Sequence, residues 1–85
     1  NSWNRFEKNF DLVYVDFLKK LEDAHPGLST TDKKLCAYLK MGLSSKEIAP
    51  LLNITVRSVE MNRYRVRKKL GLGREDNLMD YLGRF

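Results

Sequence analysis

The sequence predicts an all-α domain, and three observations indicate this fold class. Apolar residues recur at spacings of three and four, whereas the alternation that is typical of strands is missing. Only two prolines and five glycines interrupt the chain, and residues that favour helix caps follow these breaks. The length of 85 residues and the apolar content of 42% fit one globular unit. We therefore expect four short helices, arranged around a helix-turn-helix, after a long amphipathic N-terminal helix.

The leading helix is expected over residues 2–24, and it would form a segment 1–25 apart from a domain 26–85. Its apolar stripe consists of Phe6, Phe10, Val13, Phe17 and Leu21. His25, Pro26 and Gly27 then break the helix. The stripe is compatible with a helix that folds back on the domain and with a signalling or dimerising helix. Its bulky phenylalanines favour packing against a globular core.

Two short helices with capping boxes are expected next. One begins at Ser29, has Asp32 as its capping partner and ends at Gly42. Its apolar residues are Leu35, Cys36, Tyr38 and Leu39. The other begins at Ser44, has Glu47 as its partner and runs to about residue 53. Pro50 lies inside this second helix and predicts a distortion there, because proline lacks a backbone donor.

The helix expected over residues 55–70 carries the net charge of the whole chain. It contains six basic residues and one acidic residue, a sum of +5, and the rest of the chain sums to zero. On a helical wheel, Val56, Val59, Val66 and Leu70 share one face. Met61 and Tyr64 point the opposite way, together with several cations. Such concentrated charge is typical of a segment that binds a polyanion, which makes nucleic acid the first hypothesis.

The residues before this helix fit a helix-turn-helix. Ala49 is small enough for a close helix crossing, and Asn53 is one of the few non-glycine residues that tolerate a positive φ. Ile54 would fill the angle between the helices. Thr55 would cap the charged helix and leave its first N–H groups free for a phosphate. A final helix is expected over about residues 74–83, with Glu75 and Asp76 at its start.

Residues 42–59 (GLSSKEIAPLLNITVRSV), followed by KKLG at 68–71, resemble the LuxR/GerE-type DNA-binding domain of bacterial transcription regulators. The resemblance covers about residues 28–83. It implies sequence-specific binding of double-stranded DNA as a C-terminal effector domain, with the recognition helix 55–70 in the major groove. It also implies a homodimer on DNA and leaves RNA polymerase open as a further partner.

The resemblance assigns roles to single residues. Base contacts fall to Glu60, Met61 and Tyr64. The expected phosphate contacts are Ser45, Lys46, Arg57, Ser58 and Lys68. Two further phosphate contacts are expected from position alone: Thr55, because it caps the helix, and Arg65, because it lies at the flank of the exposed face. Dimerisation falls to Leu78, Tyr81 and Leu82 of the final helix, which are expected to be exposed on one side.

The chain also departs from the family pattern. Thr31 and Asp32 replace the usual Arg-Glu pair, and Lys34 replaces a later Glu. The acidic cluster that buttresses the recognition helix in the family is therefore thinner. Glu60 stands where a Lys is common, and Asn62 where a His is common. Because a carboxylate can accept from cytosine N4, the preferred DNA sequence should differ from that of typical members.

Other functions find little support. One His and one Cys are too few for a closed zinc site, and they form no convincing catalytic arrangement with other residues, so we expect no metal, no cofactor and no enzymatic activity. The two alternatives to a regulator are a promoter-binding domain like region 4 of sigma factors and a module that binds an acidic protein. The lone cysteine and the short apolar runs predict a cytoplasmic segment without membrane contact. The missing initiator Met fits a fragment, which leaves open that the full-length protein is membrane-tethered.

Overall fold

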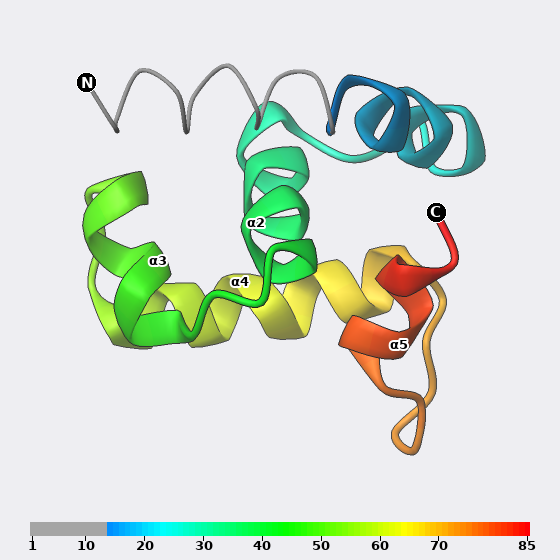
Figure 1. Cartoon of the computed structure of the whole chain (residues 1–85). Coiled ribbons are helices and arrows are strands. Elements are labelled where there is room, and N and C mark those ends of the chain that lie inside the picture. Colours follow the sequence, from blue (N-terminus) through cyan, green and yellow to red (C-terminus); the bar gives the residue numbers. More distant parts are fainter. Residues whose placement is uncertain (1–13) are drawn as a thin grey trace.

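All regular structure is helical in the computed structural model, which describes residues 14–85 (Figure 1). A helix over residues 14–24 precedes four others. These are α2 (Thr30–Lys40), α3 (Ser45–Leu52), α4 (Val56–Lys69) and α5 (Leu78–Gly83). No strand occurs in this part of the chain, so the all-α prediction is confirmed. None of the helices in residues 14–85 combines the length and the apolarity needed to cross a bilayer.

Side-chain caps begin three of the helices where the sequence predicts them. At α2, Ser29 Oγ accepts from Asp32 N–H at 3.1 Å, and the Asp32 carboxylate accepts from Ser29 N–H at 3.0 Å. Ser44 and Glu47 form the same reciprocal box at α3. Thr55 Oγ1 accepts from Ser58 N–H at 3.0 Å at α4. The caps satisfy donors that the first turn of a helix cannot pair internally.

The turn between α3 and α4 has the geometry of a helix-turn-helix. Asn53 has φ 57° and ψ 43°, a left-handed conformation that reverses the chain. Ile54 N–H then donates to Ala49 O at 3.0 Å, which closes the end of α3. Ala49 is buried at the crossing. Although Pro50 lies inside α3, the helix continues past it to Leu52.

A single core connects all the helices of residues 14–85. Its completely or almost completely buried side chains are Phe17, Leu21, Leu35, Cys36, Leu39, Ile48, Val59, Val66 and Leu82. Phe17 and Leu21 belong to it, so residues 14–24 pack against the rest of the described chain. Phe6, Phe10 and Val13 lie outside the described residues, and a dimerising role of the leading segment stays untested.

Two details of the predicted elements are wrong. The final helix begins at Leu78, with Asn77 as its N-cap, and does not extend back to residue 74. The reason is local: the Asp76 carboxylate accepts from Gly73 N–H at 2.7 Å, and Asp76 N–H donates to Gly73 O at 3.2 Å, which forms a turn. Val56 is 39% exposed instead of packed, since it lies about 60° around the α4 axis from Val59.

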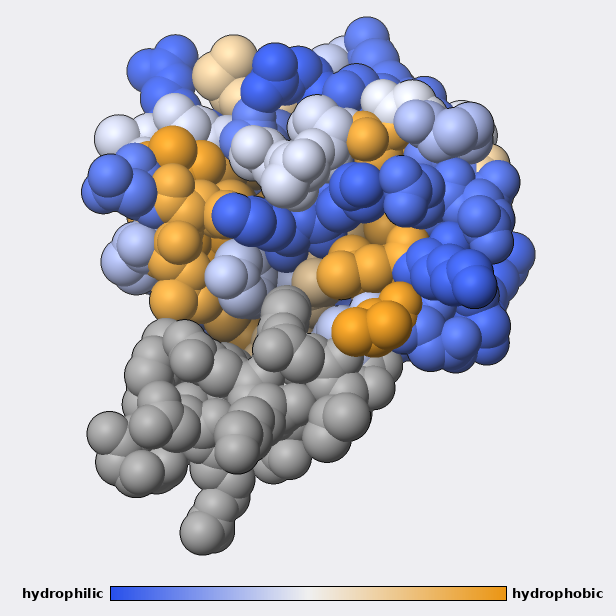
Figure 2. Space-filling model, turned by 90° about the horizontal axis from the view of Figure 1, so that it is seen from above, coloured by the Kyte–Doolittle hydropathy of each residue, from blue (hydrophilic) through white to orange (hydrophobic). Residues whose placement is uncertain are grey.

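The surface is largely hydrophilic, with an apolar area on the side where α3 lies. Figure 2 shows apolar side chains gathered there, at the left of the view, a smaller apolar group right of centre beside the grey atoms, and hydrophilic side chains along the right-hand edge. Leu51 of α3 is 41% exposed, and Leu52 and Ile54 are half-buried. The basic helix α4 runs beneath α2 in Figure 1 and packs mainly against α3 and α2.

Substitutions at Asn53 test the left-handed backbone conformation of the turn between α3 and α4. Asn53→Ala should lower the free energy of unfolding by about 1–2 kcal/mol, because a Cβ without a local polar partner disfavours positive φ. Asn53→Gly should leave stability within about 0.5 kcal/mol, because glycine adopts this conformation freely. Urea denaturation of both variants measures the difference. Equal losses for the two would contradict the assigned backbone geometry.

Candidate nucleic-acid interface

Helix α4 has a buried face and an exposed face. Val59 and Val66 are completely buried, and Leu70 is 6% exposed. Met61 and Tyr64 are each 60% exposed, although both are large and partly apolar. Glu60, Arg57, Arg65 and Lys68 are exposed as well. Apolar burial thus fixes the rotation of α4 about its axis, and the opposite face is open to a ligand.

Four of the six cations of α4 are held by defined partners. Arg63 Nη1 donates to Ser45 Oγ of α3 at 3.1 Å. Arg65 donates to the side-chain oxygen of Asn62. Arg67 Nη2 donates to Gly73 O at 2.6 Å, and Lys69 Nζ forms an ion pair with Asp32 at 2.6 Å. Three of these partners are neutral oxygens, so they orient the guanidinium groups without cancelling their charge.

The two other cations lie toward opposite ends of the exposed face. Lys68 Nζ lies 4.7 Å from the centroid of the Tyr64 ring, a cation–π contact that orients both side chains. The side chain of Arg57 makes no hydrogen bond or ion pair with any residue in 14–85. The two are eleven positions apart in the sequence, roughly 16 Å along the helix at 1.5 Å per residue. The exposed face thus carries positive charge toward each end and Glu60, Met61 and Tyr64 between.

The Asp32–Lys69 pair connects the start of α2 to the end of α4. Asp32 is 7% exposed, and burial alone would raise its pKa. The hydrogen bonds from Lys69 and Ser29, together with the charge of Lys69, outweigh this effect and hold the pKa of the carboxyl below its ordinary value. The thinner acidic cluster expected from the sequence therefore still contains one carboxylate that supports α4.

The first turn of α4 leaves donors open to an anion. Ser58 N–H is taken up by Thr55 Oγ1, and Thr55 Oγ1 also donates to Ser58 Oγ at 3.0 Å. The N–H groups of Val56 and Arg57 have no acceptor among residues 14–85. They point along the axis at the positive end of the helix dipole, where an anion is stabilised.

A family model described as bacterial regulatory proteins, luxR family, matches residues 26–82, about two thirds of the chain. The chain belongs to the LuxR family. Its members are helix-turn-helix DNA-binding domains of transcription regulators and are not typically enzymes, and double-stranded DNA is the partner that the family implies. No curated protein and no solved structure matches the chain. The match disfavours the sigma-factor alternative.

Most residues assigned to DNA by the resemblance lie on the open side of this LuxR-family domain. The exposed ones are Lys46, Thr55, Arg57, Glu60, Met61, Tyr64, Arg65 and Lys68. Ser58 is half-buried. Ser45 differs, since it is 7% exposed and its hydroxyl accepts from Arg63. Its side chain lies at the contact between α3 and α4, and a role toward phosphate would come through Arg63 or through its backbone.

The residues assigned to dimerisation do not share an exposed side, and that expectation is wrong. Leu78 is 4% exposed and Leu82 is completely buried, because both fill the core beside α2. Tyr81 is half-buried, and its hydroxyl lies 2.6 Å from His25 Nε2. Met79 is the exposed apolar side chain of α5, at 36%. Dimerisation stays a prediction.

Sequence reasoning missed two kinds of residue. Arg63 and Arg67 were counted only as charge, yet each determines the position of a neighbouring segment. Arg74 was taken as the start of a helix, and it lies in the loop after α4. The i, i+4 spacing of Arg63 and Arg67, next to the buried Val59 and Val66, could have indicated that these two lie beside the core and not on the open face.

Neither a metal site nor a reactive cysteine occurs among residues 14–85. Residues 14–85 contain no group of three or more side chains that could hold a metal ion. Cys36 is completely buried, and burial, together with the nearby Asp32 carboxylate, raises the pKa of its thiol to about 12. The thiol is therefore protonated and unreactive at neutral pH.

We expect Asp32→Asn to reduce stability in a pH-dependent way. Since the pKa of Asp32 is lowered in the folded state, its contribution is present above about pH 4 and is lost as the pH falls through the lowered pKa. At pH 7 the variant should lose about 1 kcal/mol, because Lys69 is partly exposed to solvent. Urea denaturation at pH 7 and pH 3 measures both values.

The control for this prediction is Asp16→Asn. Asp16 forms an ion pair with Lys20 at 3.0 Å, but both side chains are more than half exposed. Its loss should therefore be near zero at either pH. The role of Asp32 is contradicted if the two variants behave alike, or if Asp32→Asn costs the same at pH 3 as at pH 7.

Proposed function

We propose that α4 enters the major groove of double-stranded DNA and reads base edges through Glu60, Met61 and Tyr64. The observation that carries the proposal is the pair Met61 and Tyr64, which are 60% exposed in the middle of a helix whose other face is buried. Two large, partly apolar side chains exposed at adjacent turns form a patch of the kind that marks an interaction site. The domain would act in transcription regulation in the bacterial cytoplasm.

The three residues suit different base edges. The Glu60 carboxylate accepts hydrogen bonds and would favour the N4 amino group of cytosine. The Met61 thioether offers a flexible apolar contact, which suits a thymine methyl group. Tyr64 is held by Lys68, so its ring is oriented before DNA is bound. These three side chains would therefore prefer a DNA sequence other than the guanine-rich one that arginine or lysine side chains would select.

Phosphate contacts in this proposal flank the reading residues. Arg57, with the free N–H groups of the first turn, would bind one strand's backbone, and Lys68 would bind the other. Lys46 and Arg65 add exposed charge, while Thr55 and Ser58 order the first turn. Ser45 would act by positioning Arg63. The roles of all these side chains toward DNA are part of the proposal.

A dimer on DNA is the second part of the proposal. Two copies would place their recognition helices in successive major grooves about 34–36 Å apart. The contact would use the outer side of α5, where Met79 is exposed, and not the buried leucines. The binding of an acidic protein by α4 stays as the competing function. It predicts no preference among DNA sequences.

The base and phosphate roles are separable by substitution. Arg57→Ala and Lys68→Ala should each weaken binding to every duplex about fivefold to tenfold at 0.1 M salt and reduce the salt slope by about 0.9. Met61→Ala and Tyr64→Phe should instead change the preferred sites by about 1–3 kcal/mol per base pair, with little change on random DNA. Selection from random duplexes followed by titration measures both effects.

Matched controls remove the same groups elsewhere. Arg84→Ala deletes an exposed guanidinium beside α5, and Met79→Ala deletes an exposed thioether. Tyr64→Phe is used because it keeps the ring beneath Lys68 and removes only the hydroxyl. Equal losses on selected and random DNA from all four α4 variants would refute base reading by this face.

Dimerisation predicts a dependence on spacing. Duplexes with two selected half-sites 10–10.5 base pairs apart should bind two copies cooperatively, and an added half-turn of about five base pairs should abolish the cooperativity. Met79→Glu should reduce cooperativity while leaving single-site affinity unchanged, because it changes only the exposed side of α5. Band-shift titrations on the two spacings decide the point. Identical, non-cooperative binding to both would show that the domain acts as a monomer.

A further inference from the structure

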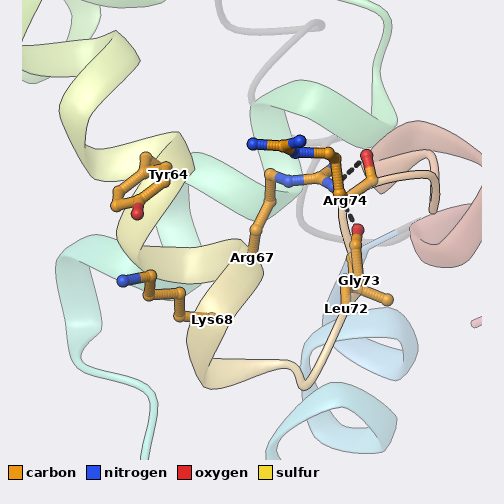
Figure 3. Close-up of a pocket in the computed structure, with 6 residues that line it drawn as sticks. All are labelled: Tyr64, Arg67, Lys68, Leu72, Gly73 and Arg74. Carbon is orange, nitrogen blue, oxygen red and sulfur yellow. Dashed lines mark hydrogen bonds between the residues drawn. The ribbon is translucent and has the colours of Figure 1, made fainter.

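A hollow lies between the C-terminal half of α4 and the loop 71–77 that follows it (Figure 3). Its volume is about 450 Å³, and it is open to solvent. Six residues line it: Tyr64, Arg67, Lys68, Leu72, Gly73 and Arg74. Three of these are cationic and none is acidic. The hollow therefore combines positive charge, a phenol hydroxyl and backbone groups in one place.

The loop that closes the hollow has a defined conformation. Arg67 Nη2 donates to Gly73 O at 2.6 Å and to Arg74 O at 3.4 Å, as the dashed lines in Figure 3 show. Gly73 N–H donates to Asp76 Oδ2 at 2.7 Å on the far side of the loop. The backbone of Arg74 is thus fixed to α4 by Arg67.

The side chain of Arg74 is available for binding. It is exposed and makes no hydrogen bond or ion pair with any residue in 14–85. In Figure 3 it extends from the loop back toward α4, and Arg67 and Lys68 line the same hollow. Three cations around one open space repel one another, and an anion between them removes this repulsion.

Acidic side chains are concentrated around the other side of the loop. A second hollow, toward α5, is lined by Glu75, Asp76 and Asp80 together with Arg84. Arg63, Arg67 and Arg74 also border a third hollow that Glu75 and Asp76 share. Of these three hollows, the one beside Tyr64 and Lys68 contains cations without a carboxylate, whereas the other two contain both charges. An anion is therefore attracted most strongly to the first.

We propose that this hollow binds a backbone phosphate of DNA, with Arg74 and Lys68 as its cationic ligands. Arg67 is a positioning residue that holds the loop in place. The inference rests on the proposed function and adds a contact from the loop after the recognition helix. It extends the footprint of the domain beyond α4.

The dimensions of α4 and of DNA support this placement. A helix of 14 residues is about 21 Å long, whereas the major groove is about 12 Å wide. If Glu60, Met61 and Tyr64 reach base edges from the middle of α4, its last turn lies over the phosphate backbone. The helix dipole disfavours an anion at that end, and the cations of the last turn and of the loop offset this effect.

The test measures binding of the whole 85-residue chain to a random-sequence duplex over a range of salt concentrations. Arg74→Ala should lower affinity about fivefold to tenfold at 0.1 M salt and reduce the salt slope by about 0.9, as loss of one phosphate contact does. Arg74→Lys should keep most of the salt slope. Arg84→Ala, which removes an exposed arginine from the acidic side, should change neither quantity.

The outcomes separate this inference from the proposed function. If the wild-type chain binds duplex DNA and Arg74→Ala binds with the same affinity and salt slope, the phosphate site is refuted. The proposed role of α4 in recognition is then unaffected. Equal losses for Arg74→Ala and Arg84→Ala also overturn it, because they reflect net charge alone. A wild-type chain that does not bind duplex DNA overturns both proposals. Circular dichroism of each variant verifies that the helices are intact.

Discussion

The rotation of α4 about its own axis is the constraint on which the rest of the structure depends. Val59, Val66 and Leu70 turn into the core and are completely or nearly completely buried. Burial of two valines and a leucine contributes several kcal/mol at about 25 cal/mol per Å², far more than any exposed contact of this helix. Once they are fixed, Met61 and Tyr64 necessarily face outward, since they lie on the opposite side. The candidate interface is therefore a consequence of packing.

The charge of α4 is oriented without being neutralised. Arg63, Arg65 and Arg67 donate to a serine hydroxyl, an asparagine amide oxygen and backbone carbonyls, all of them uncharged. Among residues 14–85, Lys69 is the one cation of α4 that pairs with a carboxylate, that of Asp32. The guanidinium groups lose rotamer freedom in the free protein, which reduces the entropy cost of binding. The net charge of +5 persists and repels itself, an arrangement that lowers stability and favours an anionic partner.

Local rules predicted most of the fold, and tertiary contacts determined what they missed. The caps at Ser29, Ser44 and Thr55 depend on residues three positions apart, so the sequence was sufficient to predict them. The same holds for Asn53, where one dihedral angle excludes most residues. The burial of Leu78 and Leu82 depends instead on contact with α2, some forty residues away. The spacing of apolar residues within one helix does not indicate such a contact. The positioning roles of Arg63 and Arg67 likewise required the distances to Ser45 and Gly73.

Helix α5 depends on contacts from the segment that precedes the region matched by the family. Six residues are too few for a stable isolated helix in water. His25 lies 2.6 Å from the Tyr81 hydroxyl, and Lys40 donates to Leu82 O at 3.2 Å while covering the Phe17 ring. Phe17 belongs to the helix over residues 14–24, which lies outside residues 26–82. The helix over residues 14–24 is thus connected to α5 through Phe17 and Lys40, and the loop 71–77 connects α5 to the end of α4.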